Sequence, residues 1–278
     1  MKTPWDGESI NQQIQLSLKN QWSQWRLKGE SPYAKIGEAG FRCYSQFEED
    51  GIILYLLTML GVHAGTVAEM GCGDGKECMA TNLILNHGYQ GFLFDGSEKN
   101  VAVANRFFGS KKDCILVKPM VQHSWITTDN VNELITSCGC PKEVDFFALD
   151  VDGNDYWIWE AINAIRPKVC CFETHDIIPG DMSITIPYDP GFDCWSQPPQ
   201  LQDFRSVSLS AMVNLSRRKG YRMIGSHRHG FNAFFMRDDV GINLFPEISA
   251  EEVHDNPWTR SGQIERWEGV KKLGWVEV

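Results

Sequence analysis

The sequence predicts an α/β fold in which short buried strands alternate with helices in a doubly wound, mainly parallel sheet. Three observations predict it. Short apolar runs recur from Thr66 onward, helix-like segments separate them, and a glycine-rich turn follows the first run. Parallel strands are continuous apolar runs because helices cover both faces of their sheet. Two closely spaced runs near the end of the domain predict an antiparallel hairpin that closes the sheet.

The N-terminal segment, residues 8–28, is expected to form an amphipathic helix. Its apolar side chains recur at helical spacing and fall on one stripe: Ile10, Ile14, Leu18, Trp22 and Trp25. We interpret this stripe as packing on the domain, and a homodimer contact or a lid is the alternative. A linker with proline and glycine follows. Residues 1–40 are therefore expected to form a helical extension.

The alternating elements begin near residue 46. Helices are expected at residues 48–61, 76–88, 98–108, 129–138 and 155–165. The second of them is closed by Gly88. Strands are expected at the apolar runs that begin at Thr66, Gly91, Cys114, Val144 and Lys168. This order is typical of parallel strands joined by crossover helices.

The end of the domain has a different pattern. Residues 209–226 predict a helix and then a strand, and residues 232–239 predict the second strand of the hairpin. Residues 177–206 are rich in Pro, Gly and Asp and lack periodicity, which predicts a long functional loop. Tyr188 and Asp189 in that loop are candidates for a substrate lid. Residues 41–240 are expected to be the main domain, with 241–278 as a C-terminal extension packed on it.

Bulk composition excludes several classes of function. The net charge of -10 argues against nucleic acid as the partner, because phosphate binding needs a basic face, and also against an anionic membrane surface. The longest apolar run, Gly51 to Val62, is too short to span a bilayer, and the N-terminus lacks the apolar segment of a signal peptide. The nine cysteines lack zinc-site spacing, which favours reduced thiols in a cytoplasmic protein.

The turn "AEMGCGDGKE" carries Gly71, Gly73 and Gly75 between the first strand and a helix. Glycines there let the backbone turn tightly and approach a ligand. Asp95 ends the next strand, where an acidic side chain can bind the ribose hydroxyls of a nucleoside cofactor. The alternative is a tight turn without a ligand.

Two residues distinguish between cofactors. A dinucleotide fingerprint is G-x-G-x-x-G, and Lys76 stands at the place of its third glycine. Glu69 precedes the turn, where a carboxylate would repel a pyrophosphate but attract the ammonium or sulfonium of S-adenosylmethionine. The turn therefore favours S-adenosylmethionine.

The sequence resembles the class I methyltransferases, and within them the FkbM-like group. The segments that carry the resemblance span Tyr44 to Asp239 and are "YSQFEEDGII", "AEMGCGDGKECMATNLI", "GFLFDGSEKNV", "WITTDNVNELI", "LDVDGNDYWIWEAI", "SITIPYDP" and "GYRMIGSHRHGFNAFFMRDD". The resemblance implies a Rossmann-like sheet of about seven strands whose last strand is antiparallel. It also implies S-adenosylmethionine as cofactor and methyl transfer to an acceptor oxygen.

The resemblance also implies roles for single residues. Glu69, Gly71, Gly73 and Gly75 would line the methionine side of the cofactor, and Asp95 would hold its ribose. Ser45 and Gln46, before the first helix of the domain, would also reach the cofactor. One departure concerns the end of the fifth strand, where the relatives have Glu-Tyr-Asn and this chain has Glu173-Thr174-His175.

Acidic and histidine side chains follow two strands expected to be neighbours. Strand four ends at Asp150 and Asp152, and strand five ends at Glu173 and His175. Ligands of such sheets sit at the carboxyl ends of the strands. Asp150, Asp152 or His175 could take the proton of an acceptor hydroxyl. Alternatively, Asp150, Glu173 and His175 could bind Mg²⁺ or Mn²⁺, and the sequence leaves both uses open.

Two further places with histidines are weaker candidates for the acceptor site. His123 follows strand three and is a second candidate base. The segment His227 to His229 lies in the hairpin turn, where it is either solvated or recognises an anionic acceptor.

The best-supported hypothesis is an S-adenosylmethionine-dependent O-methyltransferase that acts on a small polar molecule. A sugar or sugar-derivative hydroxyl is the expected acceptor, on the resemblance alone. One alternative is an NAD(P)-dependent oxidoreductase or epimerase, opposed by Glu69, the missing third glycine and the lack of a Tyr-x-x-x-Lys pair. The other is a non-catalytic Rossmann-like binding protein.

Overall fold

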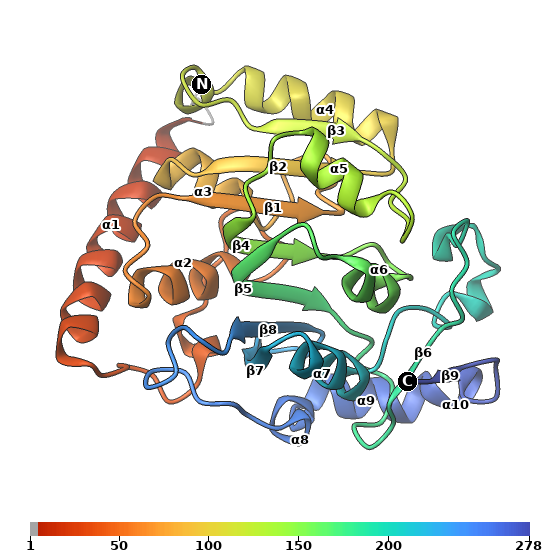
Figure 1. The fold of residues 1–278 in the computed structure, drawn as a ribbon. Helices are drawn as coiled ribbons and strands as arrows, with labels where there is room; N and C mark the ends of the chain where they lie inside the picture. The colour runs from red at the N-terminus through yellow and green to blue at the C-terminus, as the bar shows by residue number, and fades with distance from the viewer. Residues whose placement is uncertain (1–4) are drawn as a thin grey trace.

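The structure, a computed structural model, describes the backbone of residues 5–278 and the side chains from residue 12 onward. Its centre is a seven-stranded sheet in the order β3-β2-β1-β4-β5-β8-β7 (Figure 1). The strands are β1 (Thr66–Met70), β2 (Gln90–Asp95), β3 (Met120–His123), β4 (Glu143–Leu149), β5 (Arg166–Glu173), β7 (Tyr221–Ser226) and β8 (Asn232–Arg237). The first five are parallel, and β8 runs antiparallel to both β5 and β7. The predicted Rossmann-like fold is confirmed.

Helices cover both faces of this sheet. They are α1 (Trp5–Lys28), α2 (Glu49–Met59), α3 (Thr81–His87), α4 (Glu98–Gly109), α5 (Val131–Ser137), α6 (Asp155–Ala161), α7 (Leu209–Arg218), α8 (Ala250–His254), α9 (Pro257–Glu265) and α10 (Trp267–Val270). One core cluster contains side chains of α2, α3 and α4, and the other contains side chains of α5, α6 and α7. Strand β1 alternates between them, because Val67 packs in the first cluster and Ala68 in the second. Of these helices, none in the described part of the chain has the length and apolar character needed to cross a membrane.

The N-terminal helix packs on the domain, although its buried face differs from the predicted stripe. Trp22 is buried against the ring of Tyr55 in α2, at 5.3 Å between ring centroids. Ile14, however, is 55% exposed, and Gln15 occupies the buried position instead. Gln15 is satisfied there because its amide oxygen accepts from Asn82. The side chain of Ile10 lies outside the described residues, and a homodimer contact stays a prediction.

One predicted strand is wrong. The run beginning at Cys114 is a short 3-10 helix, Lys112–Cys114, followed by the exposed side chains of Ile115 and Leu116. The third strand is β3, which starts later, at Met120. This strand is at the edge of the sheet and is only partly buried, so it does not need a continuous apolar run.

Helix boundaries follow the predictions with small shifts. Gly88 ends α3 in the left-handed conformation, with a φ of 70°, as predicted. The helix expected to reach residue 165 is shorter, since α6 ends at Ala161. Ile162 is already extended, with a ψ of 122°, and leads into β5.

The long loop after β5 is partly structured and carries the C-terminal segment. It contains the short strand β6 (Ile184–Thr185), which pairs with β9 (Val276–Glu277) near the C-terminus. Ile177 and Ile178 of the same loop pack against Trp267 of α10. The C-terminal helices therefore lie beside the carboxyl edge of β5 (Figure 1). The boundaries drawn at residues 40 and 240 stay predictions.

Candidate functional site

A cavity of about 390 Å³ lies at the carboxyl edge of the sheet. Loops after β1, β2 and β4 form its floor, and the segment Phe192 to Trp195 of the long loop forms a wall. It is lined by Gly71, Gly73, Asp95, Gly96, Ser97, Asn100, Trp125, Ile126, Asp150, Val151, Asp152, Asn154, Ile158, Phe192, Asp193, Cys194 and Trp195. Five of the predicted site residues therefore meet in one cavity: Gly71, Gly73, Asp95, Asp150 and Asp152.

The glycine turn brings the loops after β1 and β4 close together. Gly71 has a φ of 90°, and a Cβ there would lie 1.7 Å from the carbonyl oxygen of Asp150. No side chain fits at that distance, so glycine is required for the approach. Gly75 has another role, because a Cβ there would meet Phe108 of α4 at 2.9 Å. Gly71 and Gly73 thus line the cavity, whereas Gly75 permits helix packing.

Asp95 connects the ends of β1 and β2. Its Oδ2 accepts from the backbone N–H of Gly73 at 2.8 Å. Its Oδ1 accepts from the N–H of Ser97 at 2.8 Å and from the amide of Asn100 at 3.2 Å. Two carboxylate oxygens have about four acceptor sites, so Asp95 retains capacity for a ligand hydroxyl.

Glu69 lies beneath the glycine turn and does not line the cavity. Its carboxylate accepts from the backbone N–H groups of Met79 and Ala80, at 3.1 and 2.7 Å, just before α3. It also accepts from the thiol of Cys78 at 3.1 Å. Burial raises the pKa of Glu69 to about 7, while these hydrogen bonds oppose the increase. Its direct contact with a cofactor stays a prediction.

Ser45 and Gln46 belong to a loop that folds around Asp50 of α2. Asp50 Oδ2 accepts from the N–H groups of Cys43, Tyr44 and Ser45, at 2.6 to 2.8 Å. Ser45 is buried, and Gln46 is exposed. Both residues lie outside the cavity lining. Their contact with a cofactor also stays a prediction.

Three carboxylates form a cluster next to the cavity. Oxygens of Asp150, Asp152 and Glu173 all lie within 4.8 Å of one another. Burial raises the pKa of Asp150 and of Glu173, and the neighbouring carboxylates raise both further. Such a set of oxygens fits a divalent cation such as Mg²⁺ or Mn²⁺, and it also fits a proton shared between two acids.

Asp152 combines an unfavourable backbone conformation with two side-chain contacts to the long loop. Its φ is 56°, which L-residues rarely adopt. Oδ1 accepts from Nη1 of Arg205 at 2.8 Å, and Oδ2 accepts from the indole N–H of Trp195 at 2.9 Å. The guanidinium of Arg205 also lies over the Trp195 ring, 5.2 Å from its centroid. Strain of this kind is typical of functional sites.

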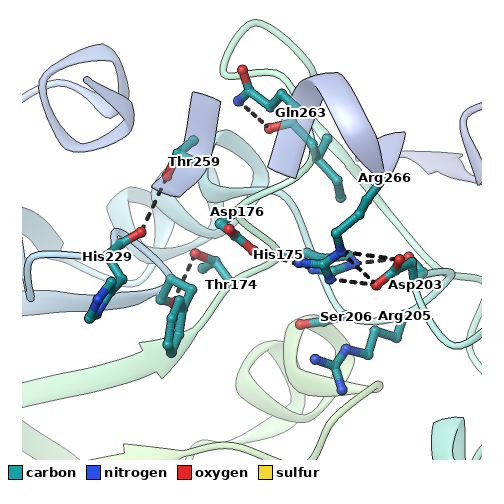
Figure 2. Close-up of polar contacts among 12 residues, drawn as sticks. Thr174, His175, Asp176, Asp203, Arg205, Ser206, His229, Thr259, Gln263 and Arg266 are labelled. Carbon is teal, nitrogen blue, oxygen red and sulfur yellow. Dashed lines mark hydrogen bonds and ion pairs between the residues drawn. The ribbon is translucent and has the colours of Figure 1, made fainter. Parts of the chain in front are cut away.

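His175 lies outside the carboxylate cluster. Figure 2 shows it beside Asp203 and Arg266, which form an ion pair next to it. Its Nε2 donates to the Asp203 carbonyl at 2.8 Å, and its Nδ1 lies 3.9 Å from Asp176. Burial, together with the nearby charge of Arg205, lowers the pKa of His175 to about 3. The structure thus groups Asp152, and not His175, with Asp150 and Glu173.

The other candidates lie around the cavity. The Nε2 of His123 contacts the carbonyl oxygen of Gly96 at 3.1 Å. The amide of Asn154 donates to the carbonyl oxygen of Asp189 at 2.7 Å, which holds the long loop over the cavity. The hydroxyl of Tyr188 contacts Thr128 at 2.9 Å. These contacts agree with a loop that covers the site.

Sequence reasoning missed Arg205 and Trp195. Both come from the aperiodic long loop, where no pattern marks a side chain as facing a site. One available signal was that Arg205 is the only arginine or lysine in residues 177–206, a segment that is rich in aspartate. At the start of α6, Asn154 makes no side-chain cap bond, and its neighbour Asp155 accepts from the backbone N–H groups of Val151 and Gly153.

No protein-family model matches this chain, and neither does any curated protein. Solved structures do match. A Galdieria sulphuraria protein proposed to be a sarcosine dimethylglycine methyltransferase is 15% identical, with a TM-score of 0.42, and the match covers 63% of this chain and 60% of that one. A Geobacter sulfurreducens S-adenosylmethionine-dependent methyltransferase in complex with S-adenosyl-L-homocysteine is 16% identical, with a TM-score of 0.37 and coverage of 68% and 70%. The small RNA methyltransferase HEN1 is 16% identical, with a TM-score of 0.43 and coverage of 76% and 28%.

Proposed function

We propose that this protein is an S-adenosylmethionine-dependent O-methyltransferase of the FkbM-like group that acts on a small polar acceptor. A sugar or sugar-derivative hydroxyl is the proposed acceptor group. The observation that carries the proposal is the meeting of the glycine turn, Asp95 and the carboxylate cluster at one cavity.

The residues around the cavity fit this cofactor. Its sulfonium supplies an activated methyl group and a positive charge. Asp150 lines the cavity, Glu173 lies beside it and Glu69 lies behind it. A bound cation lowers the pKa values of these buried carboxyl groups and stabilises their ionised forms, so a cation is favoured there. Asp95 would accept from the ribose hydroxyls. The amide oxygen of Asn154, which is buried at the cavity and has no hydrogen-bond partner among the described residues, would accept a further donor.

The carboxylate cluster suits the role of proton acceptor. As the acceptor oxygen bonds to the methyl carbon, its hydroxyl proton must leave. The ionised form of Asp150 would take that proton, and it is a stronger base than an ordinary aspartate because burial and Glu173 raise its pKa, while Arg205 holds Asp152 in place. His175 is the weaker candidate because its Nε2–H is already donated to Asp203. The proposal includes a divalent cation, Mg²⁺ or Mn²⁺, bound at the carboxylate cluster. It also includes a cytoplasmic location, with which nine free cysteines agree.

Calorimetry with S-adenosylhomocysteine and with NAD⁺ tests the proposal. S-adenosylhomocysteine is expected to bind, and Asp95→Asn is expected to weaken it by about tenfold, because an amide cannot replace both acceptor oxygens. Asp129→Asn, at an exposed position, is the matched control. Tight NAD⁺ binding without S-adenosylhomocysteine binding would refute the proposal in favour of an oxidoreductase.

A further inference from the structure

A second group of buried polar side chains lies at the same edge of the sheet, outside the cofactor cavity. It comprises Glu48 and Glu49 at the start of α2, and His227 and Asn232 at the β7–β8 hairpin. All four are at least nine-tenths buried. Glu48 Oε2, His227 Nε2 and Asn232 Oδ1 have no hydrogen-bond partner among the described residues. Buried polar atoms are normally paired, so three together call for an explanation.

The unpaired atoms differ in what they offer. His227 Nδ1 accepts from the backbone N–H of Asn232 at 3.3 Å, and burial lowers the His227 pKa to about 3. In the neutral ring Nε2 therefore carries the hydrogen and is a donor. The nearest carboxylate oxygen, Glu49 Oε1, is 3.8 Å away, which is beyond hydrogen-bonding distance. Glu48 and Asn232 contribute acceptor oxygens.

This mixture selects the chemistry of a ligand. A hydroxyl group both donates and accepts, so neighbouring hydroxyls can satisfy the donor and the acceptors together. An ammonium cannot accept from His227. An anion would be repelled by the carboxylate of Glu48. Arg228 does not offset this repulsion, because its backbone N–H and its Nε already donate to Glu48 Oε1, at 2.9 and 2.8 Å. The anionic acceptor considered for the segment His227 to His229 is therefore disfavoured.

Aromatic rings flank the polar group. The Phe47 ring lies 4.5 Å from that of His229 and 5.6 Å from that of Phe231, between centroids. The carbonyl of His229 is held by Thr259 of α9, as Figure 2 shows. A separate cavity of about 430 Å³ reaches the same hairpin, where His227 and Arg228 line it, whereas Glu48, Asn232 and Phe47 lie outside its lining. That volume is in the usual range for small-molecule sites.

The position connects this group to the cofactor cavity. Asn232 is the direct partner of Glu173 in the antiparallel β5–β8 pair, so the two side chains project from the same face of the sheet. Glu173 in turn belongs to the carboxylate cluster with Asp150, which lines the cavity. A molecule held by Asn232 would therefore lie beside the proposed proton acceptor.

We infer that Glu48, His227 and Asn232, flanked by Phe47, form the acceptor subsite and bind neighbouring hydroxyl groups of a neutral, polyhydroxylated molecule. This inference rests on the proposed function, since it supplies the oxygen that receives the methyl group. The acceptor hydroxyl gives its proton to the carboxylate cluster as the new carbon–oxygen bond forms and the carbon–sulfur bond breaks.

Ligand-observed NMR on the protein saturated with S-adenosylhomocysteine tests this inference. The probes are methyl β-D-glucopyranoside, glucosamine and glucose 6-phosphate. The neutral glycoside is expected to give the strongest saturation transfer. His227→Leu is expected to weaken its binding by about tenfold, whereas His227→Gln, which keeps a donor, should retain most of it. Selective binding of the amine or the phosphate would overturn the inference.

A second pair of variants covers the case in which His227→Leu does not fold. Phe47→Ala removes a flanking ring and is expected to weaken glycoside binding by about fivefold. Phe107→Ala, a half-buried ring on α4, is the control and should leave binding unchanged. Glycoside signals that survive both His227→Leu and Phe47→Ala would refute the subsite. Calorimetry with S-adenosylhomocysteine on the same samples separates this result from failure of the proposed function, which would abolish cofactor binding in the wild type.

Discussion

Arg205 and Asp152 form an ion pair of 2.8 Å that links the long loop to the end of β4. The charge of Arg205 lowers the pKa of Glu173 against the effect of burial. Arg205 therefore both holds the Asp152 side chain and lowers the pKa of Glu173.

Replacing Arg205 should move the pH dependence of activity. Arg205→Ala removes the positive charge, so the pKa of Glu173 rises above its present value of about 8. The acidic limb of the kcat/KM profile is expected to shift to higher pH, while Arg205→Lys should shift it little. Superimposed profiles for the wild type and Arg205→Ala would show that this charge does not control the cluster.

Gly71→Ala should destabilise the fold far more than the same change at another left-handed glycine. A methyl group at residue 71 would overlap the Asp150 carbonyl, in addition to the cost of positive φ. We expect a loss of about 3 kcal/mol or more in unfolding free energy. Gly88→Ala, at a φ of 70° with open space around it, should cost about 1 kcal/mol. Chemical denaturation of both variants measures the difference, and equal losses would contradict the proposed close approach.

Asp50 should make the protein less stable as the pH rises. Burial raises its folded-state pKa to about 6, above the ordinary value of 3.8. The folded state therefore holds this proton more tightly than the unfolded state does. The contribution is fully present below pH 3.8 and is lost as the pH rises through about 6.

Asp50→Asn tests this dependence. The amide oxygen can replace Oδ2, which accepts the loop N–H groups, while the NH₂ group replaces Oδ1, which has no partner among the described residues. Unfolding free energies at pH 5 and pH 7.5 should differ less in the variant than in the wild type, by about 1.4 kcal/mol, because about one pH unit of the gap between the two pKa values lies above pH 5. Asp129→Asn, an exposed position, should leave the difference unchanged. An unchanged difference in Asp50→Asn would exclude Asp50 as its source.

Trp195 should report on ligand binding. Its ring lines the cavity, is 63% exposed and donates to Asp152. Trp195→Phe is expected to remove part of the fluorescence change produced by S-adenosylhomocysteine and to weaken binding by about fivefold. Trp25→Phe, on α1 away from the cavity, should preserve both signals. A full signal in Trp195→Phe would place the ligand elsewhere.

A divalent cation at the carboxylate cluster should compete with protons. Because the pKa of Glu173 is raised to about 8, binding of Mn²⁺ should release protons and strengthen from pH 6 to pH 8. Glu173→Gln is expected to abolish this binding, while Glu133→Gln, exposed on α5, should leave it intact. Calorimetry in two buffers of different ionisation enthalpy measures the released protons. Binding that survives Glu173→Gln would show that the cation does not use the cluster.

Periodicity determined the order of helices and strands, and the rule that ligands of such sheets sit at the carboxyl ends of the strands determined the edge at which the site lies. Apolar runs at Thr66, Val144 and Lys168 predict the central strands because those strands are buried on both faces. The same rule fails at Cys114, since the edge strand β3 is only half covered. Gly71 was found because a tight turn that approaches a ligand needs glycine, and Asp95 because it is the acidic residue that ends the second strand.

Tertiary structure decided which side chains meet. The sequence places His175 two residues after Glu173, yet the chain turns so that His175 faces Asp203 while Glu173 faces Asp150. Arg205, about fifty residues after Asp152, reaches that residue because the long loop folds back over the sheet. Local patterns encode burial and turns, whereas partners distant in the sequence are chosen by how the loops pack, and packing has no local signature.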